Sequence, residues 1–239
     1  MKIDFHSHIL PKMDDGASST EEALKLLEML KADGVDTVVA TPHLYLHRHS
    51  VDYFLEKRAK CAEVLYEAVK DGGYPDIIIG AEVYFSTSLN ELPLRELCIG
   101  ETDYIMIELP YNTFSRTFLN SFADFVNGCE YNIILAHIER YFDYNNAEQM
   151  KEILSYGLLA LVNCDSFTNL RNRHLLTRLI KNGEVQLLGT DLHSVEGRPP
   201  EFGKAERIIR RKISDTAFEN MMTAAENVLN NESPDKILG

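Results

Sequence analysis

The sequence predicts an α/β fold, an irregular (β/α) barrel of seven parallel strands. Short apolar runs alternate with stretches of helical periodicity along the whole chain, which is typical of parallel strands joined by helical crossovers. Histidine, arginine or acidic residues follow almost every apolar run. A barrel explains this because all its strands end at one mouth, where active sites are built. An open doubly wound sheet would gather such residues at a single crossover point.

Seven apolar runs are predicted as strands. The first is short and precedes a pair of histidines, and the second is rich in β-branched residues and ends at Pro42. The third and fourth runs each end next to a glutamate, and the last three end close to polar residues. The predicted strands cover residues 3–5, 35–41, 77–81, 104–107, 132–136, 158–163 and 185–189.

The segments between the strands have helical periodicity. The first helix is the best specified, because Ser19 and Glu22 match a capping box and Gly34 follows its end. The helix of residues 51–71 stops at a pair of glycines. Two helices in succession close the chain after the last strand. The predicted helices cover residues 19–33, 51–71, 117–129, 146–156, 170–182, 201–212 and 215–230.

Length and composition favour one domain over residues 1–239, because 239 residues that are 45% hydrophobic can bury one substantial core. No apolar run is long enough to span a membrane, and the N-terminal residues do not have the pattern of a signal peptide. The four cysteines are far apart and show no CxxC spacing, so we expect a reducing, cytoplasmic location. The net charge of −13 argues against a nucleic-acid partner.

The first sixteen residues contain the first candidate metal ligands. His6 and His8 alternate along an extended segment and therefore point to the same side. Neutral imidazole is the commonest metal-binding side chain. Asp14 and Asp15 follow in a turn closed by Gly16 and compete for one role as an oxygen ligand, for which the register of the motif favours Asp15. Taken alone, the two histidines fit a surface pair equally well.

The polar residues beyond the other strands turn this pair into a candidate metal site. Five histidines and four carboxylates exceed the ligands of one ion, since zinc closes with about four. The mixture suits two or three clustered ions such as manganese, iron or zinc. Clustered cations lower the pKa of a bound water and hold the oxygens of a phosphoryl group. The candidate ligands are His6, His8, Asp15, His43, Glu82, Glu108, His137, Asp191 and His193.

Five motifs resemble the polymerase-and-histidinol-phosphatase (PHP) superfamily over nearly the whole chain. Within it, the opening Ile-Asp-Phe-His-Ser-His-Ile-Leu-Pro and the following Asp-Asp-Gly look like the bacterial metal-dependent protein tyrosine phosphatases of capsule and exopolysaccharide loci (CpsB/CapC type). The other motifs occur in the matching order: Thr41-Pro42-His43, Gly80-Ala81-Glu82, His137-Ile138-Glu139-Arg140 and Asp191-Leu192-His193. The resemblance implies a TIM-like barrel of the PHP type that hydrolyses phosphotyrosine by attack of a metal-activated hydroxide.

The resemblance also implies roles for individual residues. According to the resemblance, one metal would be bound by His6, His8, Glu82 and Asp191. A second would be bound by Glu82, Glu108 and His137, and a third by Asp15, His43 and His193. The ions would be manganese first, with iron or zinc as alternatives. Arg140 and Arg198 would bind phosphate as the catalytic arginines. The expected substrate is the tyrosine-rich tail of a polysaccharide-assembly kinase. The segments 162–166 and 189–190 depart from the family pattern, which affects substrate specificity more than metal binding.

Several alternatives stay open at this level. Histidinol-phosphate phosphatase would share the metal site and differ only in the pocket, and a non-catalytic metal-binding partner domain is a more distant possibility. Glu139 reads as a residue behind the ligands or a solvated one, and Cys164 lacks the phosphate loop of cysteine phosphatases. About half of six loop aromatics are expected to pack and the rest to line a slot for an aromatic ring: Tyr45, Tyr84, Phe85, Tyr111, Phe114 and Phe142.

Overall fold

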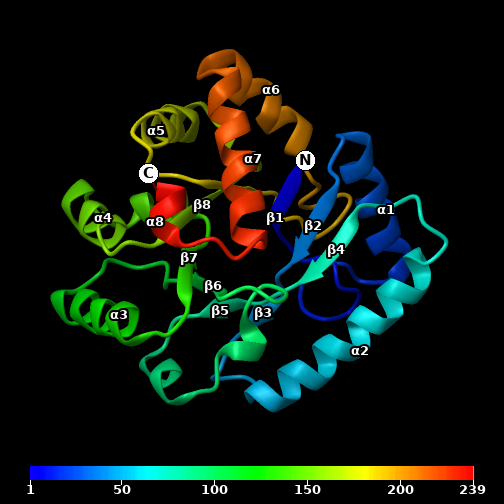
Figure 1. Cartoon of the computed structure of the whole chain (residues 1–239), viewed down its shortest axis with the longest axis horizontal. Coiled ribbons are helices and arrows are strands. Elements are labelled where there is room, and N and C mark those ends of the chain that lie inside the picture. The colour runs from blue at the N-terminus through cyan, green and yellow to red at the C-terminus, as the bar shows by residue number, and fades with distance from the viewer. Residues whose placement is uncertain (239) are drawn as a thin grey trace.

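A curled sheet of parallel strands lies at the centre of the computed structural model, which describes residues 1–238, and helices surround it (Figure 1). Each of the seven predicted runs contains at least one strand. The strands are β1 (Ile3–Ser7), β2 (Thr37–Ala40), β3 (His43–Leu44), β4 (Asp76–Ile79), β5 (Glu82–Tyr84), β6 (Tyr104–Glu108), β7 (Asn132–Leu135), β8 (Leu159–Asn163) and β9 (Leu187–Gly189).

The predicted single barrel of seven strands is only partly present. The hydrogen-bonded ladders form two sheets, with the orders β1-β2-β4 and β3-β5-β6-β7-β8-β9. Two further short strands lie just beyond the predicted runs of residues 35–41 and 77–81: β3 follows Pro42, which has no N–H to donate to a ladder, and β5 follows Gly80 and Ala81. The last and first strands are not joined by a full ladder; the one bridge between them is an isolated one, from Ser7 of β1 to Leu192, three residues after β9. The architecture is therefore a mixed α/β fold with a curled parallel sheet, similar to a half-barrel.

The seven predicted helices form within two residues of their expected ends, and side-chain caps explain where most of them begin. Ser19 accepts the N–H of Glu22 at 3.2 Å, as predicted, but the Glu22 carboxylate binds the N–H groups of Ser18 (2.9 Å) and Val195 (3.2 Å) instead of closing the box. The helices are α1 (Thr20–Ala32), α2 (Val51–Val69), α3 (Arg116–Gly128), α4 (Ala147–Leu154), α5 (Leu170–Lys181), α6 (Phe202–Lys212) and α7 (Asp215–Leu229).

Short helical segments were not expected from the sequence. A final helix, α8 (Pro234–Leu238), follows α7, and four 3₁₀ segments lie in the connections: η1 (Thr87–Glu91), η2 (Arg95–Leu97), η3 (Ile138–Asp143) and η4 (Asp165–Phe167). Runs of three to six residues are too short to show a helical period in the sequence. No helix within residues 1–238 combines the length and apolar character needed to cross a bilayer.

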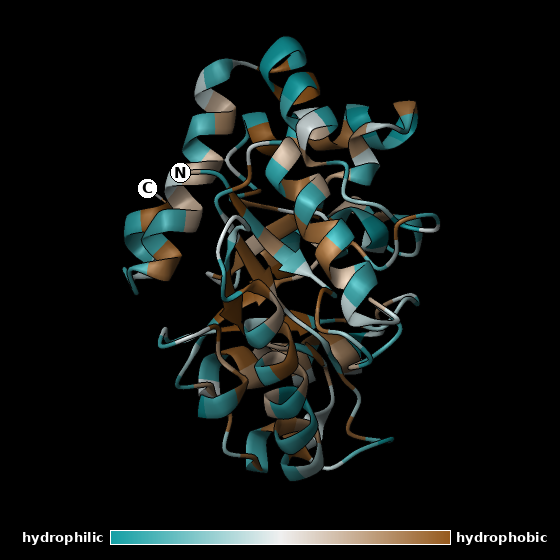
Figure 2. Ribbon diagram, turned by 90° about the vertical axis from the view of Figure 1, so that its right-hand side faces the viewer, coloured by the Kyte–Doolittle hydropathy of each residue, from teal (hydrophilic) through white to brown (hydrophobic). Residues whose placement is uncertain are grey.

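The interior of the sheet is apolar and is covered by α7 at the end where the strands begin. Side chains of Phe5, Tyr104 and Leu187 belong to one buried cluster with Ala225 and Val228 of α7. At the same end, the N–H of Asp103 donates to the side chain of Asn231 at 2.8 Å. Figure 2 shows the apolar strands at the centre and hydrophilic residues on the outer faces of the helices. At the opposite end, where the strands finish, buried polar residues such as Glu108 and Asp191 replace the apolar ones.

Close contact between β9 and β1 depends on a glycine. A Cβ added to Gly189 would lie 2.5 Å from Cβ of His6 and 3.0 Å from its backbone N. Contacts this short cannot be relieved by a flexible side-chain end, because both neighbouring atoms lie in or next to the backbone of β1. The absence of a side chain at Gly189 therefore sets how closely the first and last strands approach, and it sets the position of His6.

We expect Gly189→Ala to lower the free energy of unfolding by about 1–3 kcal/mol, because the added methyl overpacks the β1–β9 contact. Gly128→Ala is the matched control, since nothing lies within 4 Å of a Cβ built there. That change should stay within about 0.5 kcal/mol of the parent. Denaturant unfolding followed by circular dichroism measures both. Equal stabilities for the two variants would show that the strands have room at this position.

Candidate metal centre

All nine predicted ligands come together at the end of the molecule where the strands finish. They form four overlapping groups, and within each group one ligand atom per residue lies within 4.8 Å of the others. The shared residues are His6, His8, His43 and Glu82, so the four groups make one continuous cluster. The groups are His8, Asp15, His43 and His193; His6, Glu82 and His137; His6, His8 and Asp191; and His43, Glu82 and Glu108.

His6 and His8 are oriented from behind and keep one nitrogen free. Both side chains are fully buried. Nδ1 of His6 lies 2.6 Å from Oγ1 of Thr41, and Nδ1 of His8 lies 2.7 Å from a carboxylate oxygen of Asp14. The buried Nε2 atoms of both rings have no hydrogen-bond partner. Metal-binding histidines in proteins are held in the same way, with one nitrogen anchored by an oxygen and the other directed at the ion.

Glu82 lies at the centre of the cluster. Its Oε1 is 2.6 Å from Nε2 of His137, and its Oε2 is 2.8 Å from Nδ1 of His43. Burial favours the protonated acid, but the surrounding rings of His6, His43 and His137 hold the pKa of Glu82 well below its usual value. Burial also lowers the pKa of His6 and His137, which favours the neutral imidazole that binds metals. An anionic carboxylate held between imidazole rings fits a bridge between two cations.

Asp191 connects the ligand cluster to the two predicted arginines. Its Oδ1 lies 3.4 Å from Nε2 of His6 and 3.3 Å from Nε2 of His8. Its other oxygen accepts hydrogen bonds from Arg140 and from Nη1 of Arg198 at 3.2 Å. Burial favours the protonated acid, but His6, His8 and Arg140 together hold the pKa of Asp191 well below its usual value. Both arginines therefore lie beside the candidate metal ligands.

The two aspartates of the N-terminal turn have different environments. Asp14 faces inward, where it contacts the His8 ring and accepts the N–H of His43 at 2.9 Å. The Asp15 side chain is 73% exposed, with Oδ1 lying 3.5 Å from Nε2 of His193 and 3.7 Å from Nε2 of His43. The hydrogen bond with His193 lowers the pKa of Asp15 to about 2. Asp15 is the aspartate that belongs to a ligand group, and Asp14 lies behind the group.

We expect Asp14→Asn to weaken metal binding by about 10- to 100-fold while the fold persists, because the His8 ring loses its anionic partner. Isothermal titration of the metal-stripped protein with Mn²⁺ measures the change. The exposed Asp52→Asn in α2 provides a control that should bind as the parent does. Unchanged affinity in the Asp14 variant would mean that the His8 ring is positioned by packing alone.

Two residues behind the ligands were missed or only partly recognised from the sequence. Asn163 at the end of β8 donates from Nδ2 to Asp191 at 2.8 Å, in the segment that departs from the family pattern. Glu139 is buried rather than solvated, and it accepts hydrogen bonds from Ser166 at 2.9 Å and from the N–H of Asn163 at 3.2 Å. Burial raises the pKa of Glu139 to about 7. A lone asparagine or glutamate beyond a strand gives no signal for such a role.

We expect the stability difference between the parent protein and Glu139→Gln to depend on pH. The folded state keeps the Glu139 proton up to about pH 7, whereas the unfolded chain loses it near 4.5. The contribution of Glu139 to stability is therefore fully present below pH 4.5, and about 3 kcal/mol of unfolding free energy is lost as pH rises from there through 7, a loss that the neutral glutamine lacks. Denaturant unfolding at pH 5 and pH 8 measures it, with exposed Glu63→Gln as the control. Parallel pH profiles for the parent and the Glu139 variant would contradict the buried protonated acid.

The loop aromatics divide roughly as expected. Phe85 and Phe114 are buried and pack with the rings of α3, and Phe142 packs against the core. Tyr45 and Tyr111 lie at the metal cluster instead. The Tyr45 hydroxyl donates to Glu108 at 3.3 Å, and the Tyr111 hydroxyl accepts from Nη1 of Arg140 at 3.1 Å.

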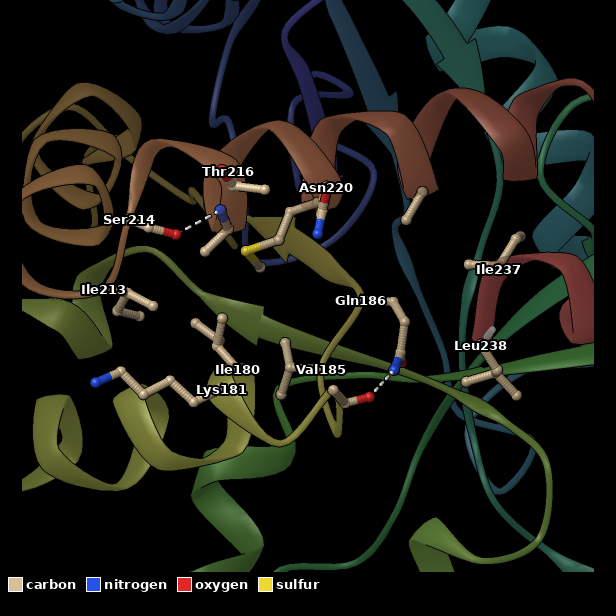
Figure 3. A pocket seen from close by; sticks show the side chains of 14 residues that line it. Ile180, Lys181, Val185, Gln186, Ile213, Ser214, Thr216, Asn220, Ile237 and Leu238 are labelled. Atoms are coloured by element: carbon tan, nitrogen blue, oxygen red, sulfur yellow. Dashed lines mark hydrogen bonds between the residues drawn. The ribbon is translucent and has the colours of Figure 1, made fainter.

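A separate cavity lies between α5, α7 and α8, away from the metal cluster (Figure 3). Its volume is about 460 Å³. Val185 and Gln186 in its lining precede β9, whereas the candidate ligand Asp191 follows β9, so the cavity and the metal cluster lie at opposite ends of this strand. The Gln186 amide donates to the carbonyl of Gly183 at 2.6 Å, and Ser214 accepts the N–H of Ala217 at 3.0 Å. These two side chains are hydrogen-bonded within the protein, and we assign no function to this cavity.

Comparison with known proteins decides the family. Residues 2–230 match the model described as capsular polysaccharide synthesis, CpsB/CapC. The chain belongs to the CpsB/CapC family. Curated members include the tyrosine-protein phosphatase CpsB of Streptococcus agalactiae serotype III (strain NEM316), 26% identical over 251 residues that cover 96% of this chain and 98% of the relative. The tyrosine-protein phosphatase YwqE of Bacillus subtilis (strain 168) is 25% identical over 241 residues, which cover 97% of this chain and 92% of the relative.

Solved structures share the fold of this CpsB/CapC chain. One is described as part of the crystal structures of YwqE from Bacillus subtilis and CpsB from Streptococcus pneumoniae, unique metal-dependent tyrosine phosphatases. It aligns with a TM-score of 0.80 and 23% identity, over 97% of this chain and 95% of that one. The histidinol phosphate phosphatase of Lactococcus lactis, solved with zinc, L-histidinol and phosphate, aligns with a TM-score of 0.53 and 17% identity. The alignment covers 88% of this chain and 93% of that one.

Proposed function

We propose that this chain is a metal-dependent protein tyrosine phosphatase, a phosphoric monoester hydrolase. The supporting observation is the set of buried polar atoms without partners at the ends of the strands, namely Nε2 of His6, Nε2 of His8 and Oε2 of Glu82. Unpaired buried polar atoms are costly, and a cation bound between them would remove that cost. The names of the curated relatives support phosphotyrosine as the substrate.

The donor atoms suit two or three divalent cations. Five imidazoles and four carboxylates favour borderline ions, so we propose manganese first, with iron or zinc as alternatives. The implied third set, Asp15, His43 and His193, stays together and gains His8. The other groups differ from the implied division, because Glu108 lies with Glu82 and His43, and His137 lies with Glu82 and His6. Glu82, which is shared by two groups, is the residue best placed to connect neighbouring ions.

The reaction we propose is hydrolysis of the phosphate ester without a covalent enzyme intermediate. Bound cations would supply an activated water and offset the charge on the phosphoryl oxygens. Arg140 and Arg198 would bind the phosphate, because a guanidinium offers paired donors that match its oxygens. The Tyr111 hydroxyl lies 3.1 Å from Nη1 of Arg140 and helps to hold that side chain at the cluster. A tyrosinate leaving group has a pKa near 10 and needs less proton donation than an alkoxide.

The physiological substrate that we propose is the phosphorylated tyrosine-rich tail of a kinase in polysaccharide assembly. The family description and the names of the relatives support a role in capsule synthesis. Residues 1–239 would act as one domain. We also propose a cytoplasmic location, since Cys61, Cys98, Cys129 and Cys164 are all free thiols.

Hydrolysis of a phosphotyrosyl peptide by metal-stripped protein, before and after addition of Mn²⁺, tests the proposal. We expect negligible release of phosphate without metal and recovery on addition. Histidinol phosphate assayed in parallel separates the nearest alternative activity, and we expect the peptide to be preferred. Metal-dependent turnover of histidinol phosphate but not of the peptide would replace the proposed substrate. No turnover of either would leave the chain as a non-catalytic metal-binding domain.

A further inference from the structure

Positive charge is concentrated on two neighbouring helices of an otherwise acidic protein. Helices α5 and α6 contain nine of the chain's 24 Lys and Arg residues and one acidic residue, Glu206. The two helices therefore carry +8, and the rest of the chain, whose total is −13, carries −21. Neither the metal cluster nor the proposed reaction uses this charge. A separation of this size between two helices and the remainder creates a local positive field.

The positive side chains line a groove. It has a volume of about 760 Å³, and its lining includes one residue of α5, all five basic residues of α6 and a single acidic residue, Asp215 of α7. The basic lining residues are Arg173, Lys204, Arg207, Arg210, Arg211 and Lys212. Ile208 of α6 also contributes to the lining, so the groove offers an apolar contact between the charges.

Three of these charges have no anionic partner among residues 1–238. Arg210 is paired with Glu206, Asp215 and Glu219, and Lys204 is paired with Glu201. Within residues 1–238, the ion pairs found do not include Arg207, Arg211 or Lys212, and all three side chains are exposed. Unpaired cations along a groove can bind an anionic ligand without first breaking an internal ion pair.

The groove begins on the same side of the fold as the metal cluster. Both helices follow strand ends: α5 comes after β8, and α6 starts four residues after Arg198. Arg173 and Lys204 lie in the first turns of α5 and α6, whereas Arg211 and Lys212 end α6. The eleven residues of α6 span about 16 Å, which matches about five residues of an extended peptide. If the phosphotyrosine of a substrate peptide is bound at Arg198, the residues next to that phosphotyrosine can therefore extend into this groove.

We infer that the groove between α5 and α6 binds an acidic segment flanking the phosphotyrosine of a protein substrate. This inference rests on the proposed function for the identity of the substrate. A short peptide is favoured over an extended polyanion because the remainder of the molecule, at −21, repels any ligand that continues beyond the groove. A membrane surface is disfavoured because the lining is concave and because Leu170 alone is an exposed large apolar side chain on the described α5 and α6.

The double variant Arg207→Gln/Arg211→Gln tests the groove, and Lys60→Gln/Lys70→Gln is the matched control. The control removes the same charge from exposed positions on α2 and at its C-cap, on the opposite side of Figure 1 from α5. The substrates are a phosphotyrosyl peptide with five acidic residues on each side, the same peptide with glutamines in their place, and phenyl phosphate. KM and kcat are measured at low and high salt.

We expect the parent to have about a tenfold lower KM for the acidic peptide than for the neutral one, and high salt should remove the difference. The groove variant should lose this preference, keep its kcat and hydrolyse phenyl phosphate as the parent does, whereas the control variant keeps the preference. Equal KM values of the parent for the two peptides would overturn the inference. Equal losses in the groove and control variants would do so too, because they would indicate a dependence on net charge alone.

A binding measurement separates this inference from the proposed function. Fluorescence anisotropy with the unphosphorylated acidic peptide needs no turnover, so it reports on the groove even if no phosphotyrosyl peptide is hydrolysed. We expect binding by the parent and the control variant and a loss of about tenfold in the groove variant. Sedimentation of the protein with phosphatidylglycerol vesicles measures binding to an anionic membrane surface for comparison with peptide binding. Binding to vesicles that depends on Arg207 and Arg211, without binding of the peptide, would overturn the inference in favour of a membrane surface.

Discussion

Asp191→Asn is expected to lower the turnover of a phosphotyrosyl peptide by about a thousandfold while leaving the fold intact. Asp191 faces the free nitrogens of His6 and His8 with one oxygen and the two arginines with the other. Asparagine keeps the shape but removes the charge that would bind a cation. It also tolerates the left-handed backbone at this position, where φ is 52°.

His6→Ala is the companion variant and should abolish turnover through loss of a ligand instead of a charge. Near-ultraviolet circular dichroism and thermal unfolding show whether each variant keeps its tertiary structure. Asp143→Asn serves as the control, since the Asp143 side chain is 56% exposed and pairs only with Arg171 on the surface. Folded variants with full activity at either Asp191 or His6 would remove these residues from the proposed metal site.

The sequence was sufficient to predict that the candidate ligands lie close together, because this follows from the order and direction of the strands. Parallel strands end at one edge, so residues placed in the last positions of β1 or just after β7 and β9 must meet there, however far apart they are in the chain. His6, His137 and Asp191 illustrate this. None of the three needed a side-chain position to be identified, because the register of each strand already determined where its last residues lie.

The residues behind the ligands could not be predicted, because their roles depend on side-chain geometry. Asp14 and Asp15 are adjacent and chemically identical, yet one orients His8 and the other belongs to an outer group. Asn163 touches Asp191 only because β8 and β9 are paired, with Asn163 opposite Gly189. A single sequence contains no information on such pairs until the neighbouring strands are placed.

The division of the sheet was missed for a local reason. The predicted strand of residues 35–41 stops at Pro42, which cannot supply a ladder hydrogen bond, but the chain resumes pairing directly afterwards as β3, in a different sheet from β2. The break has a consequence for the site. It places His43 at the start of β3, in register with Glu82 at the start of β5. The irregularity of the sheet thus brings two candidate ligands together at adjacent positions.

Arg140→Lys should separate phosphate binding from metal binding. The Arg140 guanidinium contacts both Asp191 and the Tyr111 hydroxyl, and its side chain is 29% exposed. Lysine keeps the positive charge but has no planar fork for two phosphate oxygens. We expect kcat/KM for the phosphotyrosyl peptide to fall by about a hundredfold and inhibition by inorganic phosphate to weaken, with Mn²⁺ affinity unchanged.

The comparison with His6→Ala makes this prediction selective, because the histidine variant should lose Mn²⁺ affinity and the arginine variant should not. Arg116→Lys in α3 is the control; its side chain is 68% exposed and pairs with Glu152 on the surface. If Arg140→Lys lost metal as His6→Ala does, the role of Arg140 would be to hold Asp191 in place for the ions. Retained affinity together with weaker phosphate inhibition would assign the guanidinium to the phosphoryl group itself, as the proposed mechanism requires.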